Sequence, residues 1–517
     1  MERPTAEAVG RGAGYVAAAN VITSLIAFAF YAAAARILGP RGMGEVTMLF
    51  LVIGLYGAVG LLGANAAAAR FAAYHSGSGS AGRAASAIVR SMELAAAGSL
   101  ASFAALAAAS PWISAALGIP EGLVLLGLAA GLASNAGSAL SGALQGLAMF
   151  GDISAQSVMA SALSRIPAIA LAIPLGPVGV AVAWALGPAA GALYAALRLR
   201  RRLGPRVRAR DADPVSLREI LVFSAPLYAL SIISFLQGWL GISFLYAVSR
   251  SLEVTGAYYV ASASAGILGI IYGALSTALL PAMSFRFGEA GHRGVADALR
   301  SAEGIVVYVT LTASLAAAAA SRPLLELFYG PAYAAYAPEF SVLAGAAVVG
   351  ALGSLYGTSL QSMGMTREWL VAGAASVGVL FGSLAALAPV VGAIGVAVAA
   401  VVSSATSLAM SYWYVRRRAG HAIALHPRKL AFAASVGVVV AMAQATAGWA
   451  HLHTVGSVAV DAIALVAAFA ILSRAMDPLE PWERAALLGA IPAALRPLAG
   501  ALVGPGARGR GRWRKAK

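Results

Sequence analysis

The chain contains no cysteine and very little charge. Only 11% of its 517 residues are charged, and lysine accounts for three of the 36 basic residues. The lack of cysteine excludes disulfides, thiolate nucleophiles, zinc-thiolate sites and iron–sulfur clusters. None of the three lysines follows a glycine, so the chain has no phosphate-binding loop of the GK[ST] type. No ATPase of that kind is built into it.

Motifs of enzymes are also missing. The sequence has no GxSxG elbow, no HExxH pair and no calcium-binding loop pattern. The acids expected in outer loops are isolated from one another, which gives catalytic carboxylates no place to cluster. The sequence therefore predicts a protein that is not an enzyme, with no cofactor and no metal site.

Apolar residues are what the chain has in abundance. They make up 60% of it, and the mean hydropathy is +0.82. A helix needs roughly 20 apolar residues to cross a bilayer. The pattern predicts an all-α integral membrane protein with about 14 transmembrane helices. The candidate spans are 14–35, 46–69, 88–110, 122–147, 153–174, 177–197, 221–247, 257–281, 302–320, 339–361, 368–389, 392–414, 430–449 and 455–474.

Basic residues alternate between the loops. One set of loops and tails carries 31 of the 36, the opposite set carries Arg36, Arg41, Arg250 and Arg322, and Arg165 falls inside a span. By the positive-inside rule both termini are cytoplasmic, in a multi-pass protein of the cell membrane. The net charge of +16 then indicates attraction of the basic loops and tail to anionic lipids of the inner leaflet rather than a nucleic-acid partner. The oligomeric state is open, and a monomer is compatible with the sequence.

An internal repeat organises the chain. Residues 176–202 and 392–418 are identical at 10 of 27 aligned positions, and both end in three arginines. Six helices in each copy predict parallel repeats related by a pseudo-two-fold axis along the membrane normal. The expected segments are an N-terminal six-helix half (1–200), a basic cytoplasmic linker (201–219), a C-terminal six-helix half (220–418), two extra transmembrane helices (419–475), and an interfacial segment with a basic tail (476–517).

Polar residues within or beside the spans are the candidate site. A charge inside the bilayer normally faces a partner or a water-filled cavity, so Arg165 is the sharpest candidate. A structural ion pair would also account for it, and Asp461 is available as the partner. Arg36, Arg70 and Arg250 stand at helix ends, where arginine grips phosphate or simply anchors the helix. Further candidates for a polar cavity, or for hydrogen bonds between helices, are Asn20, Asn65, Asn135, Gln237 and Gln361.

Several short motifs, in order, resemble a known family. The motifs cover about residues 12–418 and occur in this order: ARILGPRGMGEVTMLF, LLGANAAAARFAAYHSG, LQGLAMFG, FSAPLYA, GAYYVASASAGIL, LELFYGPAY and LAPVVGAIGVAVAA. They are similar to polysaccharide biosynthesis flippases of the multidrug/oligosaccharidyl-lipid/polysaccharide (MOP) exporter superfamily. The resemblance implies that a lipid-linked oligosaccharide, with its phosphate or pyrophosphate, is carried from the inner to the outer leaflet by alternating access.

That resemblance gives the arginines a role. It implies a cationic cavity in which Arg36, Arg70, Arg165 and Arg250 are the candidate phosphate contacts, although only Arg36 lies on a family motif. A cation-coupled multidrug-type exporter of small molecules would have the same fold. That branch often places an acid in the first helix, where this chain has only Asn20. A membrane-embedded glycan transferase and a non-transporting scaffold also stay open as functions.

Overall fold

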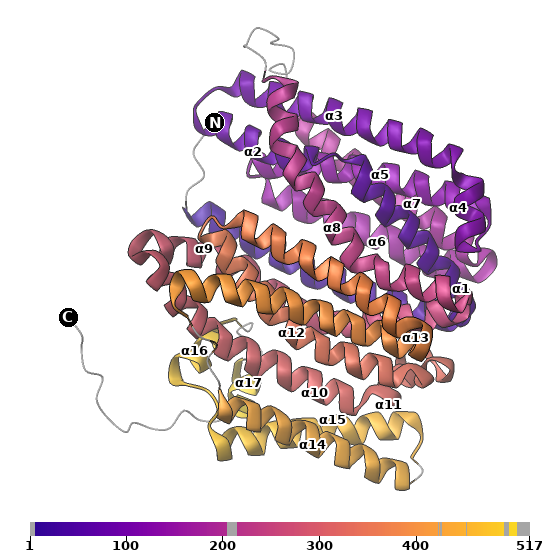
Figure 1. The fold of residues 1–517 in the computed structure, drawn as a ribbon, viewed down its shortest axis with the longest axis vertical. Coiled ribbons are helices and arrows are strands. Elements are labelled where there is room, and N and C mark those ends of the chain that lie inside the picture. Colours follow the sequence, from indigo (N-terminus) through magenta and orange to yellow (C-terminus); the bar gives the residue numbers. More distant parts are fainter. Residues whose placement is uncertain are drawn as a thin grey trace. The chain divides into compact units, whose positions relative to one another are not determined.

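The structure is a computed structural model in which residues 6–203, 215–421, 423, 426–450, 452–490 and 496–503 are described. Most of the predicted basic linker and the last residues of the basic tail lie outside these ranges. The described elements are helices (Figure 1). The first group is α1 (Ala6–Gly60), α2 (Ala64–Gly77), α3 (Ala81–Ala108), α4 (Ser110–Leu117), α5 (Glu121–Gly146), α6 (Phe150–Leu175), α7 (Pro177–Leu203) and α8 (Leu217–Ser249). The second is α9 (Leu252–Val306), the π-helix η2 (Val307–Leu311), α10 (Thr312–Ala319), α11 (Ser321–Tyr329), the 3₁₀ helix η3 (Pro331–Tyr336), α12 (Ala337–Ser362), α13 (Thr366–Ala419), α14 (Pro427–Trp449), α15 (Thr454–Met476), α16 (Pro481–Ala490) and α17 (Arg496–Val503).

The all-α membrane architecture is confirmed. Eleven helices among the described residues are long and apolar enough to span a bilayer. Helices suit these apolar segments because hydrocarbon offers no partner for an unpaired backbone amide or carbonyl. The predicted count of fourteen stays a prediction. The helix α13 covers two of the predicted spans, and α1 covers one and most of a second.

Three glycines break the longest helices. Gly39 in α1, Gly291 in α9 and Gly392 in α13 have φ angles of 66°, 60° and 62°, with non-helical ψ angles. Side chains rarely tolerate this left-handed region, so glycine is the residue that permits such a turn. Each long helix is therefore two helices joined at a glycine.

The repeat seen in the sequence is present in the backbone. Gly176, between α6 and α7, has φ 58° and ψ −139°, and Gly392, 216 residues later, has φ 62° and ψ −136°. The preceding turn also recurs, since Met149 N–H donates to the carbonyl of Leu144, and Met365 N–H donates to that of Leu360. The two copies thus share local backbone structure as well as sequence.

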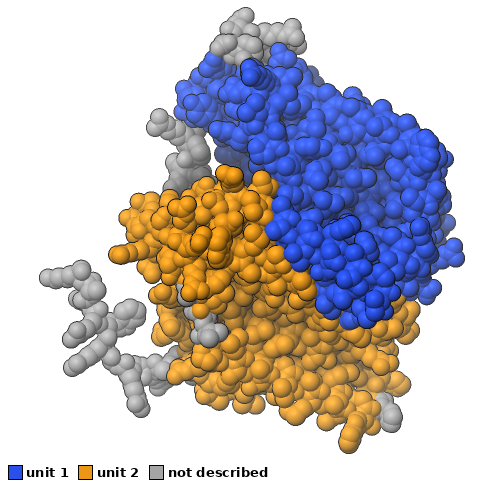
Figure 2. All heavy atoms as spheres, in the orientation of Figure 1, with its two compact units in different colours: residues 1–264, 373–400 blue, residues 265–372, 401–517 orange. Residues whose placement is uncertain are grey.

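The chain divides into two compact units (Figure 2). Unit 1 comprises residues 1–264 and 373–400, and unit 2 comprises residues 265–372 and 401–517. The two units are defined by contacts between residues, whereas the predicted six-helix halves are defined by the sequence repeat. The boundaries therefore differ: α8 and part of α13 belong to unit 1, although the repeat assigns them to the C-terminal half. The predicted boundaries of the halves remain a prediction.

Small residues set the packing of unit 1. A Cβ atom added to Gly44 of α1 would lie 2.0 Å from the carbonyl oxygen of Leu252, and one added to Gly256 of α9 would lie 2.2 Å from that of Pro40. Both approaches are too close for any side chain. Glycine therefore lets α1 and the start of α9 touch backbone to backbone, the usual way helices associate in a membrane.

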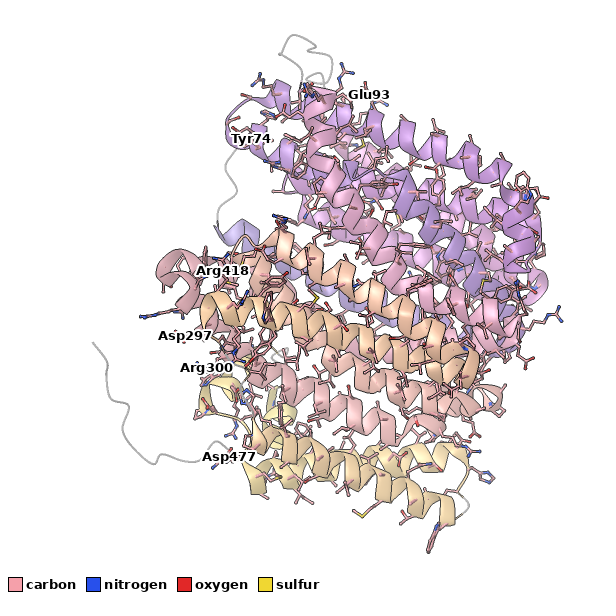
Figure 3. The ribbon with its side chains drawn as sticks, viewed as in Figure 1. Tyr74, Glu93, Asp297, Arg300, Arg418 and Asp477 are labelled. Atoms are coloured by element: carbon pink, nitrogen blue, oxygen red, sulfur yellow. The ribbon has the colours of Figure 1, made fainter. Side chains whose placement is uncertain are left out.

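In unit 2 the core is built around Leu299, Leu355 and Tyr356, all fully buried. The charged residues Asp297, Arg300, Arg418 and Asp477 gather at one end of its long helices, away from α11 (Figure 3). The arginine-rich end of α13 thus shares an end of the unit with the turn after α15. Counting spans predicts this end to be cytoplasmic.

Candidate functional site

Arg165 lies well inside α6, whose one other charged residue is Asp152 in the first turn. It follows the first residue of α6, Phe150, by 15 positions, or about 22 Å along the axis. Its guanidinium Nη1 donates to Ser161 Oγ at 2.7 Å, one turn earlier. Its Nε is buried without a hydrogen-bond partner among the described residues. One donor of the guanidinium is therefore buried and unpaired in the part of the chain that is described.

Aromatic rings surround this guanidinium. Its central carbon lies 5.2 Å from the ring centre of Trp184 on α7, a distance suited to a cation–π interaction. Tyr31 of α1 and Tyr259 of α9 share a hydroxyl–hydroxyl hydrogen bond of 3.0 Å, and both hydroxyls interact electrostatically with Arg165. We call these residues, together with the rings that pack on them, the Arg165 cluster.

Three more rings extend the cluster. Phe50 of α1 lies 4.7 Å from Trp184, centre to centre, and Trp239 of α8 stacks on Tyr259 at 5.9 Å with an angle of 14° between the rings. Phe30 lies 4.8 Å from Trp184. Gly54 leaves room for the indole of Trp239, because a Cβ there would be 2.9 Å from its Nε1. Five helices of unit 1 thus converge on one arginine.

A structural ion pair finds no support at this arginine. The groups that interact electrostatically with Arg165 are the two tyrosines, and no carboxylate is among them in the part of the chain that is described. Asp461, the acid considered as its partner, has both carboxylate oxygens without a hydrogen-bond partner among the described residues. A positive charge buried without a counter-charge calls for an anion or for water.

The other candidate arginines have different surroundings. Arg36 is exposed near the glycine turn of α1, and Arg250 is an exposed C-cap of α8 with φ 51°. Arg70 is exposed at α2, with its guanidinium 4.3 Å from the ring centre of Phe223. It lines a cavity of about 560 Å³ together with Arg218 and Glu219. Arg70 and Arg165 therefore belong to separate sites within unit 1.

The amide candidates divide between packing and exposure. Asn135 is buried and donates to Ser99 Oγ at 3.2 Å, and Gln237 donates to Ser376 Oγ at 2.7 Å. These are hydrogen bonds between helices of unit 1. Asn20 is exposed, while Asn65 and Gln361 are half-buried.

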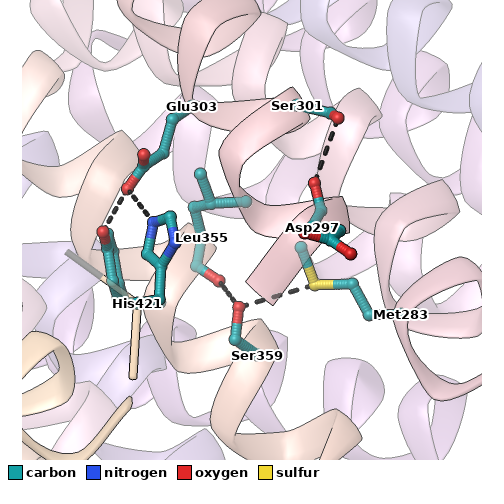
Figure 4. Close-up of polar contacts among 8 residues, drawn as sticks. Met283, Asp297, Ser301, Glu303, Leu355, Ser359 and His421 are labelled. Atoms are coloured by element: carbon teal, nitrogen blue, oxygen red, sulfur yellow. Dashed lines mark hydrogen bonds and ion pairs between the residues drawn. The ribbon is translucent and has the colours of Figure 1, made fainter. Parts of the chain in front are cut away.

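A cluster of titratable residues in unit 2 was missed by sequence reasoning. Glu303, at the end of α9, accepts a hydrogen bond from the hydroxyl of Tyr356, and its Oε1 lies 3.2 Å from Nε2 of His421 (Figure 4). One residue further on, Gly304 faces the buried pair Lys429 and Glu483, which are joined at 2.5 Å. Sequence reasoning counted Lys429 among the basic residues of a cytoplasmic loop, but it is only 5% exposed.

A histidine lies beside this second cluster. Burial, followed by the positive charge of Lys429, lowers the pKa of the His426 imidazole, so it is neutral at pH 7. Among the described residues there is no group of three or more histidine, aspartate or glutamate side chains placed to hold a metal ion. The cluster is a packing network that joins the end of α9 to α14 and α16.

Comparison with known proteins gives the chain its relatives. A family model described as "Polysaccharide biosynthesis protein" matches residues 9–286, more than half of the chain. No curated protein sequence matches it. A solved structure described as "Lipid II flippase MurJ, inward closed conformation" is similar with a TM-score of 0.68 and 11% identity, covering 88% of this chain and 97% of that one.

Two further solved structures have the same architecture. An inward-facing multidrug resistance MATE family transporter aligns with a TM-score of 0.62 and 18% identity over 77% of this chain and 94% of its own. A MOP superfamily transporter from Pyrococcus furiosus, whose binding pocket is described as reversed in polarity, aligns with a TM-score of 0.61 and 17% identity over 81% and 99%. At these identities the likeness shows the fold. The chain belongs to the polysaccharide biosynthesis protein family and has the fold of the MOP superfamily of transporters.

Proposed function

We propose that this protein is a flippase that moves a lipid-linked saccharide bearing a phosphate or pyrophosphate from the inner to the outer leaflet. The observation that carries the proposal is the Arg165 cluster, an intramembrane guanidinium with an unpaired donor and a surround of aromatic rings. Family membership and the similarity to a lipid II flippase support the same substrate class.

Each part of the cluster suits one part of such a substrate. A guanidinium is permanently charged, and its planar fork matches phosphate oxygens. Aromatic faces such as those of Trp184 and Trp239 pack against the CH faces of sugar rings, while the hydroxyls of Tyr31 and Tyr259 offer hydrogen bonds. The lipid tail would stay in the bilayer. The chain would supply one charge and several rings where the headgroup crosses.

The direct test is translocation in proteoliposomes. A fluorescent lipid-pyrophosphate oligosaccharide is reconstituted with the purified protein, and its appearance in the other leaflet is followed with a membrane-impermeant quencher. We expect protein-dependent translocation without added ATP. If no lipid carrier moves, but small organic cations are exported under a proton or sodium gradient, the protein is the multidrug-type exporter instead.

The proposed direction requires cytoplasmic termini, which thiol labelling can check. Because the natural chain has no cysteine, a single introduced cysteine is the only thiol of the protein that a maleimide can label. Ser78 is exposed between α2 and α3, and Leu452 is 43% exposed between α14 and α15. In intact cells we expect a membrane-impermeant maleimide to label Leu452→Cys at once, and Ser78→Cys only after permeabilisation. The reverse pattern would mean that the termini are outside.

A further inference from the structure

A cavity of unit 1 lies between the end of α2 and the start of α8, apart from the Arg165 cluster. Its volume is about 560 Å³. The residues that line it are Arg70 and Phe71 of α2, the α8 N-cap Ser216, and Arg218, Glu219, Val222 and Phe223 of α8. The rings of Phe71 and Phe223 meet edge to face, 5.6 Å apart between centres. Packing of the two helices thus brings two arginines to one cavity.

Aromatic rings, rather than an acid, position the first of these arginines. The guanidinium carbon of Arg70 lies 4.3 Å from the ring centre of Phe223 and 5.4 Å from that of Phe71, distances that suit cation–π interactions. Among the described residues, neither Arg70 nor Arg218 is joined to another side chain by a hydrogen bond or an ion pair. A ring contact covers the flat face of a guanidinium and leaves the N–H groups at its edge, which are the donors that bind phosphate oxygens.

The charge of the cavity wall indicates the kind of anion that fits it. Two arginines and one glutamate line the cavity, so the net charge of the wall is +1. Glu219 belongs to the first turn of α8, where the helix dipole favours an acid, and its backbone N–H donates to Ser216 Oγ at 3.2 Å. A phosphodiester is singly charged and matches this wall, whereas a pyrophosphate brings more negative charge than the wall balances.

The surroundings of the cavity suit the level of lipid headgroups. Tyr74, one turn after Arg70, is 69% exposed near the end of α2 (Figure 3), and tyrosine is enriched where a bilayer meets water. The side chains of Leu217, Leu221 and Val222, in the first two turns of α8, are 45%, 41% and 68% exposed. Exposed apolar side chains beside unpaired arginines suit a ligand that combines hydrocarbon with phosphate. A water-soluble phosphate would leave the apolar surface uncovered.

We infer that this cavity binds an anionic phospholipid of the inner leaflet, with Arg70 and Arg218 on its phosphate and its acyl chains along the apolar side chains of α8. Basic pockets between membrane helices on the cytoplasmic side bind anionic headgroups in this way. The inner leaflet follows from the expected topology, in which the end of α2 is cytoplasmic. The site is separate from the Arg165 cluster and does not depend on the proposed flippase function.

Native mass spectrometry of the whole protein tests the inference by counting bound lipids. The protein is stripped of lipid in detergent and titrated with phosphatidylglycerol, or with phosphatidylcholine of the same acyl chains, whose headgroup has no net charge. We expect the first phosphatidylglycerol to bind about 10-fold more tightly than phosphatidylcholine, the factor of one hydrogen bond to a charged group. Arg70→Gln and, on the other helix, Arg218→Gln should each reduce this preference. Arg70→Lys should keep part of it, because lysine retains the charge.

A matched control variant is Arg90→Gln. Arg90 is also an exposed arginine of unit 1, but it pairs with Glu93 at 2.8 Å on α3 and does not line the cavity. This variant should prefer phosphatidylglycerol as strongly as the wild type does. The inference is overturned if the wild type binds both phospholipids alike, or if Arg70→Gln and Arg218→Gln both retain the full preference.

Two competitors identify the source of the phosphate. Glycerol phosphate has the headgroup without hydrocarbon, and a lipid-pyrophosphate oligosaccharide represents the proposed transport substrate. We expect neither to displace phosphatidylglycerol at equal concentration. Displacement by glycerol phosphate would replace the lipid with a soluble phosphate as the ligand, and displacement by the lipid-pyrophosphate would make the cavity a site for the transport substrate; either result overturns the inference. Because binding is measured without transport, its failure is distinct from failure of the flippase proposal.

Discussion

Arg165→Gln should slow translocation of a lipid-pyrophosphate oligosaccharide about 10- to 100-fold. A hydrogen bond to a charged group is worth about 1.5–3 kcal/mol, and about 1.4 kcal/mol corresponds to a factor of ten. Glutamine retains a polar side chain but loses the positive charge and the guanidinium fork. Arg165→Lys should recover part of the rate, because lysine restores the charge without the paired donors. The measurement is initial rate per inserted protein in proteoliposomes.

A matched control separates a site effect from a general loss. Arg286→Gln removes an arginine whose side chain is 64% exposed and whose ion pair with Glu289 is long, at 3.9 Å. The translocation rate of this variant should equal that of the wild type. A neutral glycolipid with the same sugar supplies the second comparison. If Arg165→Gln slows the neutral lipid as much as the pyrophosphate lipid, the arginine supports the fold rather than contacts the phosphate.

The second large effect is on stability, at the buried pair of Lys429 and Glu483. Lys429→Met leaves the Glu483 carboxylate, itself 2% exposed, without its cation. Removing one partner of a buried pair typically costs about 3–5 kcal/mol, whereas replacing both by apolar residues is often nearly neutral. We expect a lower apparent melting temperature in detergent for Lys429→Met, and substantial recovery in Lys429→Met/Glu483→Leu.

The exposed pair Arg90 and Glu93 provides the comparison. Its side chains are 46% and 54% exposed and joined at 2.8 Å on one helix face. Arg90→Met should change stability by less than about 1 kcal/mol, because surface pairs contribute little. If Arg90→Met and Lys429→Met lower the melting temperature equally, the buried ion pair of Lys429 and Glu483 does not stabilise the packing of α14 against α16.

The sequence predicted the secondary-structure elements better than the contacts between them. Apolar runs predicted the helices, and the 216-residue offset predicted the repeat whose turns lie at Gly176 and Gly392, because both patterns are local properties of the chain. Arg165 stood out because a single charge interrupts an apolar run. Its neighbours did not, since Tyr31 and Tyr259 are 228 positions apart, and rings are common in membrane helices. Only the packing of helices reveals which rings surround it.

The cluster of titratable residues around Glu303 and Lys429 in unit 2 was not predicted, for a related reason. Glu303 and Lys429 lie near predicted helix ends, where charges are ordinary, so no single position gave a signal. Their burial arises because α14 and α16 cover the end of α9. A sequence shows that a residue is charged, but burial depends on the neighbours that tertiary structure brings to it.

The glycine turns bear on how this protein enters the membrane. At Gly176 and Gly392 one helix passes into the next with no loop between them. On the expected topology both turns face outward, so the turns themselves bring almost no polar backbone and no charged side chain across the bilayer, and Arg165 is the charge that the first pair carries into it. Such pairs suit delivery as ready-made hairpins during synthesis. A bulkier residue at either glycine should then lower the yield of inserted protein before it alters transport.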